Sequence, residues 1–241
     1  MCFEIESAFH LPREAPPKHE ARRTTIHHST PLLAYQPVST LTVSAIVPLS
    51  LLEALRNVDA PVEDGLEELA GEVVSKRLGL SGTVQAQIAR YTWHADRGHA
   101  VPLDEATSVF RLVGRRTDAP LVFADAGRRA ARRAAPRWPK VLSAMPGGLV
   151  RVIGTRAAGR VARRLVGGHL TVRDAEARGE VPAPLGLDVI PEGTGCGFYG
   201  ALFGELLRAL AGFEGAVRHT RCRARGDEGC EWRASAVGGY R

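Results

Sequence analysis

The C-terminal part of the chain carries three of its four cysteines, and their spacing constrains the fold more than any other feature. Cys222 and Cys230 flank a turn-forming stretch around Gly226, where glycine allows backbone angles that other residues disfavour. Strand-forming residues lie on both sides of this stretch, at 216–217 and 231–232. The pattern predicts a β-hairpin with the two cysteines facing each other across it, close enough to share one metal ion.

Two further candidate ligands lie nearby in the sequence. His219 precedes Cys222 by three residues, and Cys196 opens an amphipathic helix. Gly212 and Gly215 end that helix and let the chain return as a strand, which would bring Cys196 over the hairpin. The apolar positions of the helix are Phe198, Leu202, Phe203, Leu206, Leu207 and Leu210.

These four residues, Cys196, His219, Cys222 and Cys230, suit tetrahedral zinc with no open coordination position, which is a structural rather than a catalytic site. His219 and Cys222 would point to opposite faces of a regular strand, so both can bind only if the strand contains a bulge. Two alternatives remain open at this stage. The cysteines could be buried thiols beside a satisfied histidine, or Cys222 and Cys230 could form a disulfide in an oxidising compartment.

The run from His219 to Trp232 resembles the C-terminal signature of the 4-vinyl reductase domain family, which is named after a protein of bacteriochlorophyll synthesis. The family also supplies the sensory module of phenol-responsive transcription activators. The resemblance implies structural zinc bound by Cys196, Cys222 and Cys230, with His219 at a position that is acidic in the sensor members. It extends more weakly over residues 50–235.

The resemblance further implies an α+β fold like that of the TRAPP vesicle-tethering subunits and of nitric-oxide-signalling domains. Such a fold has a twisted antiparallel sheet, flanking helices and a mostly apolar pocket for an aromatic or hydrophobic ligand. The expected ligands include tetrapyrroles and phenols, and we expect a homodimer. The strand after the long helix lacks the family's usual tryptophan, because His169 and Leu170 stand near that position.

We expect residues 1–40 to be poorly ordered and residues 41–241 to form a single ligand-binding domain. Apolar periodicity and capping residues predict the individual elements of that domain. The predicted helices are 49–57, 62–78, 103–115, 125–135, 149–166 and the helix that begins at Cys196. The predicted strands are 41–47, which Pro48 ends, 83–93, 169–174 and 185–190, and a loop is expected between the last two.

The net charge of +6 comes almost entirely from arginine. Four arginines at helical spacing share one face of the 125–135 helix and could bind carboxylate, phosphate or nucleic acid, or simply be solvated. We expect no specific nucleic-acid partner, because no helix-turn-helix or RNA-binding signature accompanies them. These arginines are Arg128, Arg129, Arg132 and Arg133. No apolar run is long enough to span a bilayer and no signal peptide is apparent, so we expect a cytoplasmic protein with reduced thiols.

No catalytic constellation is visible: the chain lacks a nucleophile elbow, a P-loop, a dinucleotide fingerprint and an H-E-x-x-H motif. Together with this absence, the family resemblance favours a small-molecule-binding protein, and it is the resemblance that implies an accessory or carrier for a tetrapyrrole. Two alternatives are a vinyl reductase acting on a chlorophyllide and a dimeric regulatory adaptor for an aromatic ligand. Trp93 beside His94 could line an aromatic pocket, although such a pair more often combines core and surface.

Overall fold

The described residues are 41–60, 78–136, 147–173, 176–187 and 193–235 of a computed structural model. They form an α+β fold with six α-helices and two antiparallel sheets, which confirms the predicted class. All of them belong to one unit that spans residues 39–241. The predicted poorly ordered segment 1–40 and nearly all of the predicted helix 62–78 lie outside the described residues.

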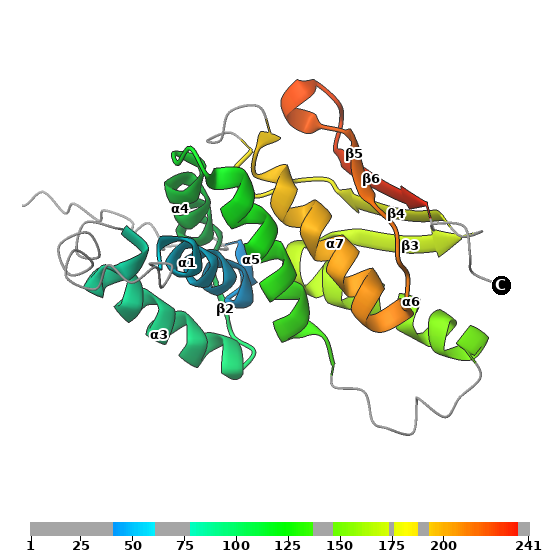
Figure 1. The fold of residues 1–241 in the computed structure, drawn as a ribbon, viewed down its shortest axis with the longest axis horizontal. Helices are drawn as coiled ribbons and strands as arrows, with labels where there is room; N and C mark the ends of the chain where they lie inside the picture. Colours follow the sequence, from blue (N-terminus) through cyan, green and yellow to red (C-terminus); the bar gives the residue numbers. More distant parts are fainter. Residues whose placement is uncertain (1–40, 61–77, 137–146, 174–175, 188–192, 236–241) are drawn as a thin grey trace, which may run out of the picture. The chain divides into compact units, whose positions relative to one another are not determined.

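The larger sheet has four antiparallel strands in the order β3-β4-β6-β5 (Figure 1). These strands are β3 (His169–Arg173), β4 (Glu176–Val181), β5 (Val217–Arg221) and β6 (Cys230–Ser235). One face of the sheet is apolar and buried, and it carries Leu170, Ala177, Val181, Trp232 and Ala234. The other face is charged, as expected for an antiparallel sheet with one solvated side.

Helix α7 (Cys196–Ala211) lies between α5 (Ala119–Ala134) and the sheet (Figure 1). Helix α6 (Gly147–Val166) packs beside α7 and against β3. Because α7 is packed on both sides, apolar residues surround most of its circumference. Its fully buried side chains include Phe198, Tyr199, Leu202, Phe203, Leu206 and Leu207. As predicted, the helix ends before Gly212, which adopts a left-handed conformation with φ of 58°.

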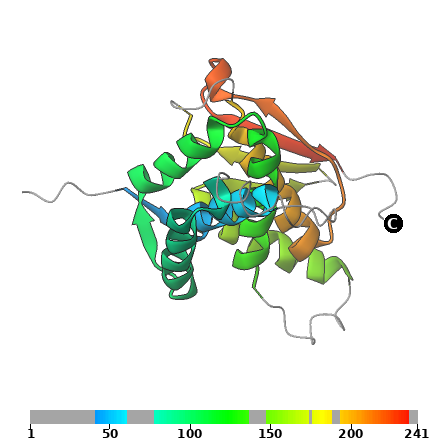
Figure 2. The same ribbon diagram turned by 60° about the vertical axis from the view of Figure 1, so that its left-hand side comes forward.

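The N-terminal elements pack on the other side of α5, which lies between α1 and α7 (Figures 1 and 2). They are β1 (Thr42–Ser44), α1 (Ile46–Asp59), a 3-10 turn (Leu78–Leu80), α3 (Gly82–Asp96), β2 (Ala100–Pro102) and α4 (Leu103–Gly114). Strands β1 and β2 pair as a small antiparallel sheet. None of the helices in the described part of the chain is long and apolar enough to cross a lipid bilayer.

The predicted strand 83–93 is wrong, because these residues belong to helix α3. The alternation seen in the sequence is local, whereas the buried positions Val84, Ile88 and Tyr91 recur every three to four residues. Ser81 caps the helix by accepting a hydrogen bond from the Val84 N–H at 3.3 Å. The sequence therefore contained the helical spacing, and β-prone residue types obscured it.

Four other elements differ from the predictions. The strand predicted over 41–47 ends at Ser44, and Pro48 lies in the first turn of α1, where its missing N–H costs nothing. Strand β4 was predicted as a loop. Helix α5 begins six residues earlier than the predicted 125–135, and within the predicted strand 185–190 the described residues 185–187 form a turn.

Most of the basic face of α5 is neutralised within the chain. Arg129 pairs with Asp125 at 2.7 Å, Arg132 with Glu205 at 3.1 Å and Arg133 with Glu53 at 2.7 Å. The Arg132 and Arg133 pairs connect α5 to α7 and to α1, whereas the Arg129 pair lies within α5. The arginine cluster that the sequence singled out thus serves, in three of its four members, as intramolecular ion pairs.

Glycine allows α5 and α7 to approach closely. A Cβ atom on Gly127 would lie 2.2 Å from the Phe198 carbonyl oxygen. We predict that Gly127→Ala lowers the free energy of unfolding by about 2–3 kcal/mol, because the helices must separate. The matched control is Gly82→Ala on α3, where nothing lies within 4 Å of the added Cβ. Urea denaturation of both variants checks this, and equal effects would contradict the proposed contact.

Glu205 on α7 is buried and pairs with Arg132 and Arg208. The hydrogen bond from Arg208 holds the pKa of Glu205 below its usual range, although burial opposes this effect. A carboxyl whose pKa is lower in the folded state stabilises the protein above its unfolded pKa, near 4.3, and that contribution is lost as the pH falls through the folded pKa.

We predict that Glu205→Gln lowers the unfolding free energy at pH 7 by about 1–2 kcal/mol and removes part of the loss seen below pH 4. Urea denaturation between pH 3 and pH 7 measures both effects. The exposed Glu228→Gln serves as the control. A variant as acid-sensitive as the parent would show that Glu205 does not contribute.

Candidate metal centre

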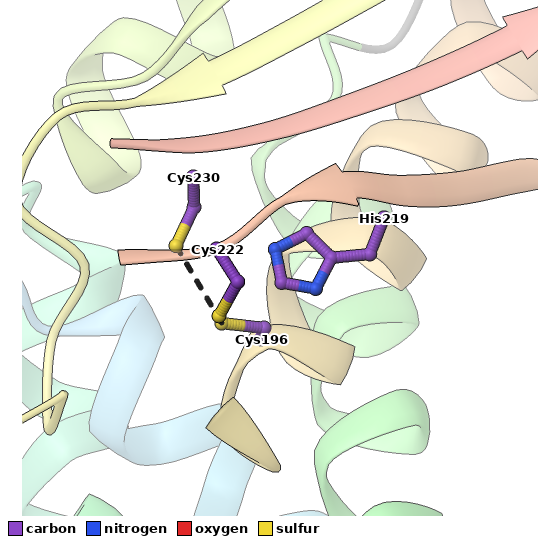
Figure 3. A group of neighbouring side chains, drawn as sticks. All are labelled: Cys196, His219, Cys222 and Cys230. Carbon is purple, nitrogen blue, oxygen red and sulfur yellow. Dashed lines mark hydrogen bonds between the residues drawn. The ribbon is translucent and has the colours of Figure 1, made fainter. Parts of the chain in front are cut away.

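Three separate segments bring Cys196, His219, Cys222 and Cys230 together (Figure 3). The candidate ligand atoms of the four side chains all lie within 4.8 Å of one another. The three cysteines are buried and His219 is half-buried. This is the group of residues that the sequence predicts as a metal site.

Cys196 is the first residue of α7 and lies at the sheet end of the helix. Its Sγ atom is 3.7 Å from the Cys230 Sγ and 4.0 Å from the Cys222 Sγ. The chain enters the helix through Gly193 and Gly195, and Gly193 has a φ of 73° that favours glycine. The first residue of the helix therefore lies in direct contact with the hairpin thiols.

The hairpin places the other two thiols opposite each other, as predicted. Cys222 directly follows β5 and Cys230 begins β6. Between them lies a short 3-10 turn (Arg223–Arg225) that ends at Gly226, whose φ is 95°. Asp227 closes the turn, because its carboxylate accepts a hydrogen bond from the Cys222 N–H at 2.7 Å. The backbone N–H of Arg223 donates to the Cys230 Sγ at 3.4 Å.

The predicted bulge is present between His219 and Arg221. His219 pairs with Trp232 and Arg221 with Glu231, so Thr220 is an extra residue on the β5 side. The bulge turns His219 toward the same face as Cys222, although three residues separate them. The imidazole stacks on the Trp232 indole with 4.8 Å between ring centroids and 15° between the ring planes, which holds it toward the sulfur atoms.

The thiols strongly perturb one another. The hydrogen bond from Cys196 lowers the pKa of Cys230, and the neighbouring His219 and the Arg223 N–H lower it further despite burial. The pKa of Cys196 is raised, because it donates that hydrogen bond and is buried beside two other sulfur atoms. A thiolate at Cys230 places negative charge in a buried cluster, which favours a bound cation.

Two further observations indicate a ligand site rather than simple packing. The Nε2 atom of His219 is buried and makes no hydrogen bond, and an unpaired buried polar atom normally has a specific reason. A Cβ on Gly193 would lie 2.9 Å from the Cys222 Sγ and 3.6 Å from the Cys196 Sγ. The backbone at Gly193 therefore lies close to the sulfur atoms, and a side chain at this position would contact them.

The space beside the cluster differs between its two sides: a hollow of about 210 Å³ borders Cys230, Val181 and Gly229, whereas the side next to Cys196 is tight. The cavity next to Cys196, between Gly193 and Leu185, measures only about 10 Å³, which holds at most about one water molecule. Tyr199 anchors the covering loop, because its hydroxyl accepts a hydrogen bond from the Leu185 N–H at 2.5 Å. Four protein ligands would fill the coordination sphere of a tetrahedral ion and leave no position on it for a substrate.

The disulfide alternative that the sequence left open is not formed, because Cys196, Cys222 and Cys230 are free thiols. The other pair that the sequence singled out, Trp93 and His94, does not join this cluster. Trp93 is 49% exposed, and its ring contacts the rings of His94 on α3 and of His99, which precedes β2.

Sequence reasoning missed three supporting residues of the site: Gly193, Asp227 and Trp232. The short Gly193–Gly195 stretch and the acidic residue after Gly226 were the signals for the first two. No family model matches the chain, and no curated protein or solved structure is significantly similar to it.

Gly193 and Gly226 provide a matched pair of variants for the site. Both have positive φ, so alanine at either position strains the backbone by about 1–2 kcal/mol. Only the Gly193 Cβ would meet the sulfur atoms, because nothing lies within 4 Å of a Cβ at Gly226. We predict that Gly193→Ala weakens cobalt(II) binding about tenfold or more, whereas Gly226→Ala leaves it nearly unchanged. Absorbance titration measures this, and equal affinities would contradict the assignment.

Proposed function

We propose that the chain is a small-molecule-binding protein of the 4-vinyl reductase domain type, built around a structural zinc ion. One observation carries the proposal: Cys196, His219, Cys222 and Cys230, identified from the sequence, converge within 4.8 Å. The antiparallel sheet with helices on its apolar face agrees with the coarse architecture that the resemblance implies. The more specific TRAPP-like fold, the tetrapyrrole or phenol class of ligand and a homodimer are part of this proposal.

The donor set and its spacing fit zinc. Sulfur ligands about 2.3 Å from a tetrahedral ion lie roughly 3.8 Å apart. The Cys196 Sγ is 3.7 Å from the Cys230 Sγ and 4.0 Å from the Cys222 Sγ. His219 offers its unpaired Nε2 as the fourth donor. Three sulfur atoms and one imidazole are a common structural zinc set in proteins.

When bound, zinc would supply a fixed tetrahedral connection with no vacant position, so it would have no substrate to activate. The residues themselves indicate what this connection joins. Cys196 belongs to the start of α7, whereas Cys222 and Cys230 belong to the hairpin. Because an unfolded chain has no preformed site, the free energy of metal binding would contribute directly to folding.

The first experiment measures metal content. We predict about one zinc per chain in purified protein, with chelation or Cys196→Ser lowering the melting temperature by about 10 °C or more. The matched control is Cys2→Ser, the same substitution at the fourth cysteine, which should retain zinc and stability. Affinity should fall at acidic pH, because protons compete with zinc for its thiolate ligands.

The absence of zinc under reducing conditions, or its retention in Cys196→Ser, would contradict the zinc proposal. A Cys222–Cys230 disulfide in reduced preparations would also contradict it and would favour the alternative that the sequence left open.

The second experiment tests ligand binding and separates it from catalysis. Zinc-loaded protein is titrated with a divinyl chlorophyllide while absorbance and fluorescence are followed. A saturable shift without turnover supports a carrier or accessory role. A further change that requires NADPH and yields the monovinyl pigment would instead establish the reductase alternative, and no shift at all would exclude this ligand.

A further inference from the structure

A groove separates the first turns of α6 from the end of β3 and the segment after α7. Its volume is about 360 Å³, within the range of about 300–1,000 Å³ typical of small-molecule sites. The residues that matter for its chemistry are Arg151, Val152, Thr155, Arg156, Val172 and Phe213. The groove is much larger than the cavity of about 10 Å³ beside Cys196.

The floor of the groove is apolar. Val172 lies on the same strand face as the buried Leu170, yet it is only half-buried, so the inner face of the sheet is incompletely covered here. Phe213, which is mostly buried, also lines the groove where the chain leaves α7. On the α6 side, Val152 is 48% exposed and its neighbour Leu149 is 46% exposed. Neighbouring exposed apolar side chains beside a hollow commonly mark a binding surface.

The rim of the groove is positively charged. Arg151, Thr155 and Arg156 recur at helical spacing on the groove side of α6. No acidic residue occurs in α6, and none is found among the described residues that line the groove. Helix α5 provides the contrast within the same chain, because there Arg129, Arg132 and Arg133 contact carboxylates. Arg156 makes no ion pair with the described residues and lies beside the apolar floor, which suits a ligand that carries its own negative charge.

The packing of α6 keeps this groove in place. A Cβ on Gly154 would lie 1.8 Å from the Leu210 carbonyl oxygen, so α6 and the end of α7 are in direct backbone contact. A Cβ on Gly159 would likewise lie 2.9 Å from the Leu170 carbonyl oxygen. The helix is thus fixed to both walls, and the groove is part of the rigid packing of the unit.

We propose that this groove binds a small amphipathic anion: a flat apolar or aromatic body that lies on Val172 and Phe213, with a carboxylate or similar group facing Arg156 and Thr155. The inference rests on the proposed small-molecule-binding function and deepens it by naming the site and the charge of the ligand.

Two fluorescent probes separate the apolar and the ionic contributions. 8-Anilinonaphthalene-1-sulfonate carries an anionic group on an aromatic body, and N-phenyl-1-naphthylamine has the same body without the charge. Both are titrated into the zinc-loaded full chain. Arg156→Gln should weaken sulfonate binding about threefold to fivefold and leave the neutral probe within about twofold. Arg163→Gln, the same substitution on α6 outside the groove, should change neither.

A second variant tests the groove itself. Thr155→Phe places a larger side chain in it and should weaken both probes about tenfold or more, because the apolar floor is then covered. Zinc content and circular dichroism should remain unchanged, which separates blocked binding from failed folding. If Thr155→Phe loses its zinc or its fold, the comparison of Arg156→Gln with Arg163→Gln decides alone.

The outcomes distinguish the groove from the proposed function. If the parent binds both probes and Arg156→Gln matches Arg163→Gln, the groove assignment is overturned while the binding function stands. If the parent binds neither probe, the groove is overturned as well, and the chlorophyllide titration then decides separately on the proposed function.

Discussion

The contact between the start of α7 and the β5–β6 hairpin is the interaction on which the rest of the structure depends. Trp232 of the hairpin lies at its centre, with the imidazole of His219 stacked on it and the rings of Tyr199 and Phe203 from α7 also packed against it. Cys196 meets the hairpin thiols at the end of the same contact. Aromatic packing and the candidate metal site therefore hold the same two elements together.

Helix α7 needs such support because its own sequence is a poor helix former. Gly197, Gly200 and Gly204 lie within it, and each glycine weakens a helix by about 1 kcal/mol relative to alanine. Two of these glycines nevertheless allow the helix to pack closely against the hairpin. Gly200 leaves room for the Trp232 indole, which would lie 3.2 Å from an added Cβ, and Gly204 does the same for Val217. Close packing replaces intrinsic propensity, and the proposed zinc connection would fix the end where that packing begins.

The local geometry of the metal centre could be predicted from sequence because it follows from short-range rules. A turn centred on Gly226 fixed the hairpin, and the odd spacing of His219 and Cys222 required the bulge. Packing between elements that are distant in the sequence could not be predicted from such local rules. Strand β4 was missed because its inward positions include Gly179, where a Cβ would lie 2.6 Å from the Phe203 ring. A strand whose buried side is shaped by a residue on a distant helix does not show the usual apolar alternation.

The central claim is that three sulfur atoms and one imidazole hold a single zinc ion between α7 and the hairpin. X-ray absorption spectroscopy at the zinc edge tests it most directly, because the first coordination shell reports ligand type and distance. The account predicts three sulfur ligands near about 2.3 Å and one nitrogen near about 2.0–2.1 Å, with outer-shell imidazole scattering. A first shell of oxygen and nitrogen alone would contradict it. A His219→Ala variant whose spectrum loses a solvent ligand but keeps the imidazole nitrogen would contradict it as well.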